Sequence, residues 1–206
     1  MFARIMSLLI GYLFGCVLVS DIVARLFSGK SAFELGDGNP GMANVGHVLG
    51  KPAAICSLLG DILKTVLATW VAGMLFPELG RLATAWAGLG ATLGHDFPFW
   101  HGFRGGKGVT TIASTIILVS PLWGILAGVV GILSIVATGY LSVAALIAMG
   151  FYVVAMLLTE GVELAAISLV FMGMQVYGHY SKLRGIADGT TKKAGLALKV
   201  RARLRR

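Results

Sequence analysis

Long apolar stretches with few charged residues constrain the fold of this chain more than any other feature. The first runs from Ile5 to Phe27 and the second from Ala53 to Phe76. Each is long enough to cross a bilayer, which takes about 20 residues. Only 13% of the 206 residues are charged, whereas soluble domains carry about 25%. Because so little charge cannot cover a soluble surface, the sequence predicts an all-α integral membrane protein.

Five further apolar segments bring the total to seven. They are Leu82–Leu93, Val109–Val119, Leu122–Thr138, Val143–Thr159 and Leu164–Tyr177. The first two of these are short and could be half-spans or re-entrant helices. We therefore expect a bundle of about seven transmembrane helices, some of them short, in a single domain over residues 1–180. A basic tail over residues 181–206 follows it.

Lysine and arginine are distributed unequally between the two sides of this bundle. If all seven segments cross, one side holds Lys30, Lys51, Arg104, Lys107 and the nine basic residues between Lys182 and Arg206. The other side holds only Arg4 and Arg81. Since positive residues mark the cytoplasmic side, we expect an external N-terminus and a cytoplasmic C-terminus. The tail Lys192–Arg206 is predicted to lie on anionic lipid headgroups rather than to bind nucleic acid.

The histidines all fall on the predicted cytoplasmic side. They are His47, His95, His101 and His179. Three histidines could form a zinc site, but no HExxH or similar spacing supports one. We therefore expect no metal, and interpret the histidines as hydrogen-bond donors or proton carriers.

The first predicted cytoplasmic loop is rich in glycine and asparagine. It reads Gly-Asp-Gly-Asn-Pro-Gly-Met-Ala-Asn-Val-Gly-His over residues 36–47. Such a run can adopt positive φ angles and turn its backbone amides toward one point, as anion-binding nests do. The alternative is a flexible connector, but two asparagines among four glycines beside a membrane helix favour a functional loop.

The second predicted cytoplasmic loop carries the strongest local signal. Residues 94–108 read Gly-His-Asp-Phe-Pro-Phe-Trp-His-Gly-Phe-Arg-Gly-Gly-Lys-Gly and lead into the next apolar segment. Exposed amides at a helix N-terminus, together with Arg104 and Lys107, form a phosphate-binding arrangement. The spacing is not that of a Walker A loop. The aromatic residues suit the headgroup region of the membrane, so we expect a phosphorylated ligand at the membrane surface.

Two pairs of opposite charges lie inside apolar segments. Asp61 and Lys64 are three residues apart and Asp21 and Arg25 are four apart, so each pair shares one helix face. Charges within the membrane are costly and are either paired structurally or functional. For Lys64 both interpretations stay open.

These motifs together resemble a known family, the bacterial acyl-phosphate:glycerol-3-phosphate acyltransferases. The resemblance rests on Gly-Asn-x-Gly-x-x-Asn from Gly38, Asp-x-x-Lys from Asp61 and Gly-His-x-x-Pro from Gly94, followed by Phe-x-Gly-Gly-Lys-Gly-Val from Phe103. It implies a bacterial inner-membrane protein with a cytoplasmic active site. It also implies transfer of an acyl group from acyl phosphate to the sn-1 hydroxyl of glycerol 3-phosphate, forming lysophosphatidic acid, with no cofactor and with the departing phosphate accepting the hydroxyl proton.

The resemblance also assigns residues. The implied catalytic residues are Ser142, His179 and Lys107. The implied substrate-binding residues are Asn39, Gly41, Asn44, His47, His95, Arg104, Gly105, Gly106, Lys107 and Gly108. Asp61 and Lys64 are candidates for support within the membrane.

Several polar positions depart from the family pattern. Asp37 stands where the family has serine, Ala43 replaces a threonine, His47 aligns with an arginine, and the residues around His179 lack the usual arginine, asparagine and glutamate. One alternative is therefore a divergent paralogue that binds a phosphorylated lipid precursor or performs a related transfer. Another is a small transporter or lipid-binding protein built around Asp61 and Lys64, although the sequence shows no convincing internal repeat.

Overall fold

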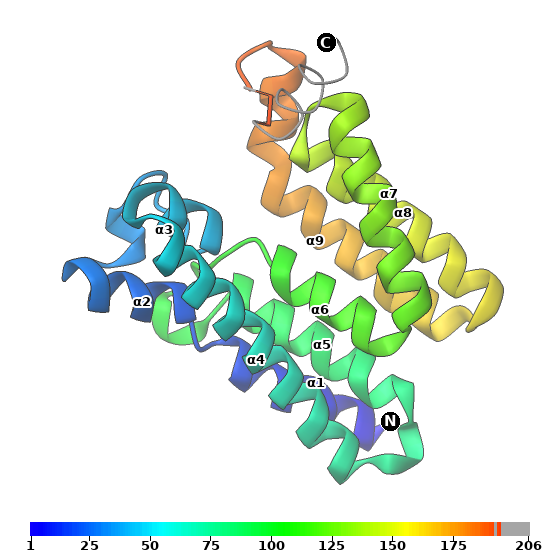
Figure 1. The fold of residues 1–206 in the computed structure, drawn as a ribbon. Helices are drawn as coiled ribbons and strands as arrows, with labels where there is room; N and C mark the ends of the chain where they lie inside the picture. The colour runs from blue at the N-terminus through cyan, green and yellow to red at the C-terminus, as the bar shows by residue number, and fades with distance from the viewer. Residues whose placement is uncertain (192, 195–206) are drawn as a thin grey trace. The chain divides into compact units, whose positions relative to one another are not determined.

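A computed structural model describes residues 1–191, 193 and 194, and every regular element among them is a helix (Figure 1). The α-helices are α1 Phe2–Gly15, α2 Val19–Ser28, α3 Met42–Leu49, α4 Lys51–Leu75, α5 Arg81–Asp96, α6 Val109–Val119, α7 Pro121–Thr138, α8 Leu141–Thr159 and α9 Val162–Ala187. Short 3-10 helices are η1 Ala32–Glu34, η2 Pro77–Leu79 and η3 Phe99–His101. The predicted all-α fold is confirmed. Of the predicted headgroup-binding tail Lys192–Arg206, Lys192 and residues 195–206 lie outside the described residues.

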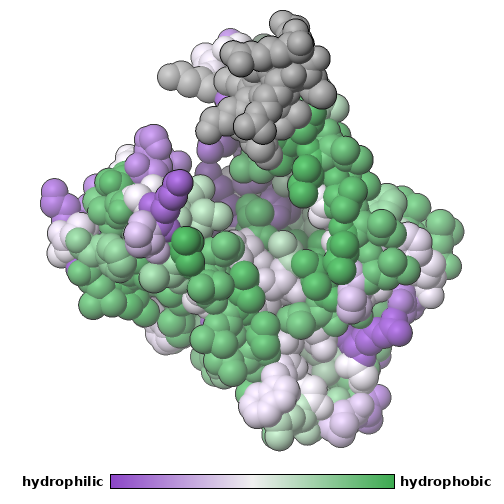
Figure 2. Space-filling model, in the orientation of Figure 1, coloured by the Kyte–Doolittle hydropathy of each residue, from purple (hydrophilic) through white to green (hydrophobic). Residues whose placement is uncertain are grey.

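Five stretches of helix are long and apolar enough to cross a membrane. They are Phe2–Ser28, which contains α1 and α2, and the helices α4, α7, α8 and α9. Apolar side chains cover much of the visible surface of α4 and α7 in Figure 2, as expected for helices in contact with lipid. With 16 and 11 residues, α5 and α6 are shorter, and they correspond to the two segments predicted to be short. The orientation of the termini stays a prediction.

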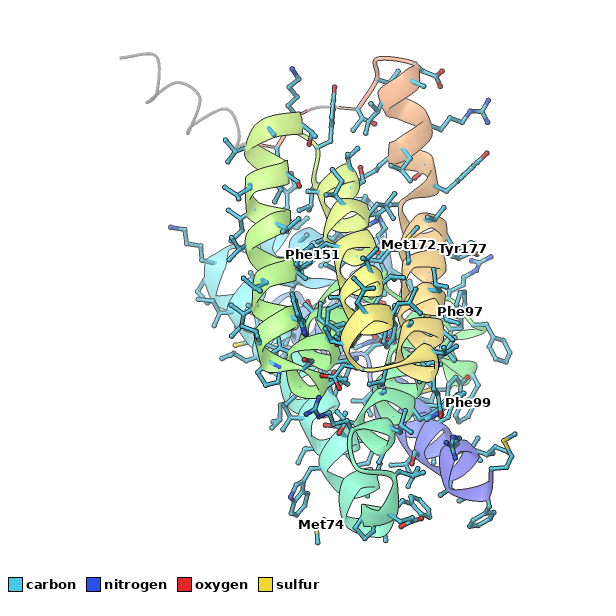
Figure 3. The ribbon with its side chains drawn as sticks, turned by 90° about the vertical axis from the view of Figure 1, so that its right-hand side faces the viewer. Met74, Phe97, Phe99, Phe151, Met172 and Tyr177 are labelled. Atoms are coloured by element: carbon cyan, nitrogen blue, oxygen red, sulfur yellow. The ribbon has the colours of Figure 1, made fainter. Side chains whose placement is uncertain are left out.

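The helices divide into two compact units, Met1–Val119 and Ser120 onward. In the first unit, α1 lies along α5, and α4 packs against α1, α2, α3, α5 and α6. In the second unit, α8 packs against both α7 and α9, and the three helices run side by side (Figure 3). Because α9 continues to Ala187, its last turns belong to the segment assigned to the tail. The division at residue 180 stays a prediction.

The first apolar segment contains a break that its pattern does not predict. α1 ends at Gly15 and α2 begins at Val19, so the carbonyl groups in between lose their helical partners. Lys64 Nζ donates to the carbonyls of Gly15 and Val17, at 3.2 and 2.9 Å. The ring nitrogen of Trp100 donates to the carbonyl of Cys16, at 2.9 Å. Two residues that are distant in the sequence therefore stabilise the end of α1.

Candidate functional site

The loop between α5 and α6 folds back onto the end of α5. The Gly106 amide donates to the His95 carbonyl at 2.9 Å, and a Cβ atom at Gly105 would clash with that same carbonyl. Only glycine allows the loop to lie this close. Because α6 begins at Val109, the Gly-Gly-Lys-Gly sequence of residues 105–108 ends at a helix N-terminus, as predicted for a phosphate-binding loop.

The His95 side chain lies between this loop and the middle of α4. Its ring is buried, and its Nε2 atom would clash with a Cβ atom at Gly106. Its Nδ1 atom is 2.9 Å from Lys64 Nζ. Lys64 Nζ is also 2.8 Å from Asp61 Oδ1, so the predicted ion pair is present. The structure therefore brings His95, two loop glycines, Lys64 and Asp61 together in one cluster.

Asp96 adds a buried acid that the sequence interpretation did not single out. Its carboxylate lies beside Gly108, close to where a Cβ atom at that position would be. Its Oδ1 atom is buried without a hydrogen-bond partner among the described residues. The sequence feature that could have identified Asp96 is an acidic residue directly after His95, at the end of an apolar helix. Burial raises the pKa of the Asp96 carboxyl group well above its usual range.

Aromatic residues attach the same loop to the end of α1. The Tyr12 hydroxyl donates to the Phe97 carbonyl at 2.8 Å. The rings of Tyr12 and Phe99 stack with their centroids 6.4 Å apart, and the ring centroids of Phe99 and Trp100 are 4.4 Å apart. Phe99, Trp100 and Phe103 are exposed, as expected of residues at the headgroup level. The break after α1 and the α5–α6 loop thus form one connected region.

The first predicted loop is organised around the side chain of Asn44. Residues 42–49 form α3, a short helix that the glycine-rich sequence did not predict. Asn44 Oδ1 accepts from the Asp37 amide at 3.0 Å, while Nδ2 donates to the carbonyls of Leu35 and Asn39 at 2.8 and 3.0 Å. Because these bonds use both ends of the amide, Asn44 shapes the loop. Gly36, with a φ of 53°, passes so close to Asn44 Oδ1 that a Cβ atom would clash.

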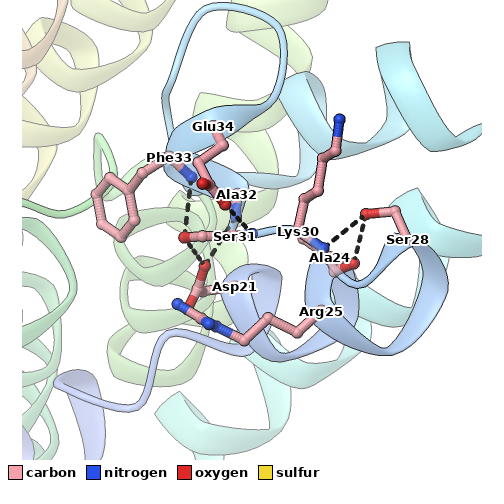
Figure 4. A network of polar contacts seen from close by, with 9 residues as sticks. All are labelled: Asp21, Ala24, Arg25, Ser28, Lys30, Ser31, Ala32, Phe33 and Glu34. Atoms are coloured by element: carbon pink, nitrogen blue, oxygen red, sulfur yellow. Dashed lines mark hydrogen bonds and ion pairs between the residues drawn. The ribbon is translucent and has the colours of Figure 1, made fainter.

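A second polar network fixes the start of this loop on α2 (Figure 4). Asp21 Oδ1 accepts from the Ser31 hydroxyl at 2.5 Å and from the Ala32 amide at 2.8 Å, and Oδ2 accepts from Arg25 Nε at 2.8 Å. The Ser31 amide donates to Glu34 Oε2 at 2.7 Å, which completes a capping box. The predicted Asp21–Arg25 pair is present, and it serves to hold the loop.

The remaining predicted site residues lie in three places. Asn39 and Gly41 immediately precede α3, and His47 lies within it. Arg104 is exposed, and Lys107 is half-buried in the α5–α6 loop. Ser142 and His179 are buried in the second unit, Ser142 in the first turn of α8 and His179 in α9. Within the described part of the chain, no three His, Cys, Asp or Glu side chains are grouped so that they could hold a metal ion.

Solved structures with the same fold are integral membrane enzymes. The chain is similar to PlsY, an integral membrane glycerol 3-phosphate acyltransferase, in its glycerol 3-phosphate form, with a TM-score of 0.82 and 26% identity over 96% of this chain and 98% of that one. The lysophosphatidic acid form of PlsY matches with a TM-score of 0.81 and 25% identity.

Curated relatives share the same description. A glycerol-3-phosphate acyltransferase from Lactobacillus johnsonii is 41% identical over 130 residues, which cover 63% of either chain. One from Thermoanaerobacter pseudethanolicus is 29% identical over 192 residues, 93% of this chain and 96% of the relative. The more similar relative is therefore matched over less than two thirds of its length. The family model for glycerol-3-phosphate acyltransferase matches residues 5–189, and the chain belongs to that family.

Proposed function

We propose that this chain transfers a fatty acyl group from acyl phosphate to the sn-1 hydroxyl of glycerol 3-phosphate and so forms lysophosphatidic acid. Its family and its similarity to an integral membrane enzyme solved in glycerol 3-phosphate and lysophosphatidic acid forms support this proposal. The observation that carries it is the Gly-Gly-Lys-Gly loop, which lies against His95 and ends at the N-terminus of α6.

The residues of this loop would bind the phosphate groups of the substrates. Arg104 and Lys107 provide positive charge, and the amides of residues 105–108 provide donors beside a helix N-terminus. Asn39, Gly41 and His47 would contact the glycerol part of the substrate, in a loop whose shape Asn44 maintains. Ser142 and His179, with Lys107, are the proposed catalytic residues.

The reaction itself places limited demands on these groups because acyl phosphate is already activated. The sn-1 hydroxyl oxygen bonds to the acyl carbon, the bond from that carbon to the phosphate oxygen breaks, and the departing phosphate takes the hydroxyl proton. The protein aligns the two substrates and stabilises the charge that develops between them. A nucleophilic side chain is not required for this sequence of events.

The membrane fold and the charge distribution of the sequence support a proposal for the cellular setting. We place the protein in the bacterial inner membrane, with the α5–α6 loop facing the cytoplasm and the basic tail on anionic headgroups. Both substrates would then reach the site at the cytoplasmic membrane surface, where the exposed aromatic residues of the loop meet the headgroups.

The proposal is tested with purified protein in detergent, a long-chain acyl phosphate and radiolabelled glycerol 3-phosphate. We expect lysophosphatidic acid to form only when both substrates are present, and not when acyl-CoA replaces acyl phosphate. Lys107→Ala should raise the KM for glycerol 3-phosphate about 10- to 100-fold or abolish activity, since a hydrogen bond to a charged group contributes about 1.5–3 kcal/mol.

Lys51→Ala is the matched control. It removes the same charge from an exposed position at the start of α4, outside the proposed site, and should leave the KM unchanged. Protein that binds glycerol 3-phosphate but forms no lysophosphatidic acid would be a divergent paralogue rather than this enzyme. If Lys107→Ala behaves like Lys51→Ala, the phosphate site lies elsewhere.

A further inference from the structure

Lys64 is buried near the middle of α4, and its ammonium group is surrounded by acceptors. Its Nζ atom meets two backbone carbonyls, of Gly15 and Val17, and His95 Nδ1 at 2.9 Å. An ammonium group has three N–H donors and accepts no hydrogen bond. Asp61 Oδ1 at 2.8 Å adds a fourth acceptor and the opposite charge, so more acceptors than N–H donors surround the ammonium group.

The contact with Lys64 determines where His95 carries its proton. Because the ammonium only donates, His95 Nδ1 must accept, so this nitrogen has no proton. A neutral imidazole with an unprotonated Nδ1 carries its proton on Nε2. Asp61 Oδ1, 2.8 Å from Lys64 Nζ, places a negative charge directly beside the ammonium group.

His95 Nε2 faces the proposed phosphate-binding loop. It lies so close to Gly106 that a Cβ atom there would clash with the ring, and the same residue's amide is bonded to the His95 carbonyl. An Nε2–H donor is therefore directed at the loop in which Lys107 and the glycine amides lie.

We propose that Lys64 is a positioning residue for the acyl transfer: through Nδ1 it fixes His95 in the Nε2–H form, so that the ring donates a hydrogen bond to a phosphate oxygen held at the Gly-Gly-Lys-Gly loop. This inference rests on the proposed function. Groups that orient a metal-ligating imidazole through its other nitrogen change metal affinity or activity about 10- to 100-fold when removed, and we expect an effect of the same size here.

A competing explanation is that Lys64 only caps the end of α1. Trp100 provides the comparison because it caps the same helix end through the carbonyl of Cys16 and has no described contact with His95. If capping were the whole role of Lys64, then Lys64→Met and Trp100→Phe would both lower the melting temperature and leave the His95 ring unchanged.

The decisive measurement is the proton position on His95, read from long-range proton–nitrogen NMR spectra of protein labelled with nitrogen-15 histidine, with His95→Gln used to assign the signal. We expect the Nε2–H form in the unmodified protein and in Trp100→Phe. We expect the Nδ1–H form, or a mixture of both, in Lys64→Met. The kcat/KM of Lys64→Met should fall about 10- to 100-fold, with no further loss when it is combined with His95→Gln.

Two results would overturn the inference: an Nδ1–H or doubly protonated His95 in the unmodified protein, or the same ring form with and without Lys64. If Lys64→Met does not fold, the test uses the unmodified protein and Lys64→Arg, which keeps a donor at this position. The position of the proton on His95 in these two proteins then decides whether the inference holds. Failure of the unmodified protein to make lysophosphatidic acid would instead overturn the proposed function. The two failures are distinguishable because the spectra do not depend on activity.

Discussion

Both units contain local hydroxyl bonds along their helices, such as Ser7 to Ala3 and Thr92 to Gly88 in the first, but the contacts described for the first unit also include long-range side-chain bonds. In the unit Met1–Val119, side chains bond to groups far away in the sequence, such as Lys64 to Val17 and Trp100 to Cys16. In the unit that begins at Ser120, Thr138, Thr159 and Ser168 donate to carbonyls four residues back in their own helices. Exposed apolar side chains cover helices in both units.

The difference shows in which parts of the protein buried polar groups hold separate segments together. A local bond to the preceding helical turn satisfies a hydroxyl and links nothing else. The long-range bonds of the first unit hold two loops and a helix break in fixed positions, and these are the places where the candidate site residues of this unit lie. We therefore expect substitutions of polar and small residues to be costly in the first unit and mild in the second.

The largest effect should come from removing the charge of Asp61. Asp61→Asn leaves the buried Lys64 ammonium without its counter-charge, and breaking a buried pair in this way costs about 3–5 kcal/mol. We expect a strongly lowered melting temperature in detergent. The matched substitution in the second unit is Asp188→Asn, because Arg184 and Asp188 form an exposed pair at 4.0 Å, and exposed pairs contribute little. Equal losses in the two variants would remove the proposed difference between the units.

A smaller but still clear effect should come from the close contact of α1 with α5. A Cβ atom at Gly94 would clash with the backbone of Tyr12 and Cys16, so Gly94→Ala should push the helices apart and cost about 1–3 kcal/mol. Gly150→Ala in α8 is the control, because no described atom beyond the adjoining backbone of α8 lies within 4 Å of the added Cβ there. The alanine should raise stability by about 0.5–1 kcal/mol through helix propensity. Thermal unfolding of both variants tests this, and a stable Gly94→Ala would contradict it.

The sequence predicted the helices of the second unit better than the details of the first. Apolar runs were enough to find α7, α8 and α9, since a membrane helix needs only length and apolarity. The break at residues 16–18 was not predictable, because the chain stays apolar through it and its stabilising groups, Lys64 and Trp100, lie about 50 and 80 residues away. Similarly, the residue type of Asn44 could not show that the loop backbone uses its amide group. The resemblance implied that His95 and the glycine-rich loop belong to the site, but not that His95 links the loop to α4 through Lys64.

Substitutions of one buried amide in each unit should have opposite effects on stability. Asn44 uses its side chain on several backbone groups, so Asn44→Ala should cost about 1–3 kcal/mol by leaving those groups unsatisfied. Gln175 in α9 is also buried, but its Oε1 atom has no hydrogen-bond partner among the described residues. Gln175→Leu therefore removes a polar group that burial penalises, and stability should rise by about 1 kcal/mol.

The activity of Gln175→Leu distinguishes a packing role of this side chain from a functional one. If the side chain at this position only packs in the core, Gln175→Leu should raise the melting temperature and leave the formation of lysophosphatidic acid unchanged. A higher melting temperature together with lost activity would mean that the unsatisfied amide is kept for a substrate, since functional sites retain polar groups at the expense of stability. The second unit would then contribute a buried polar group to function as the first does, and the contrast between the units would concern only how each one folds.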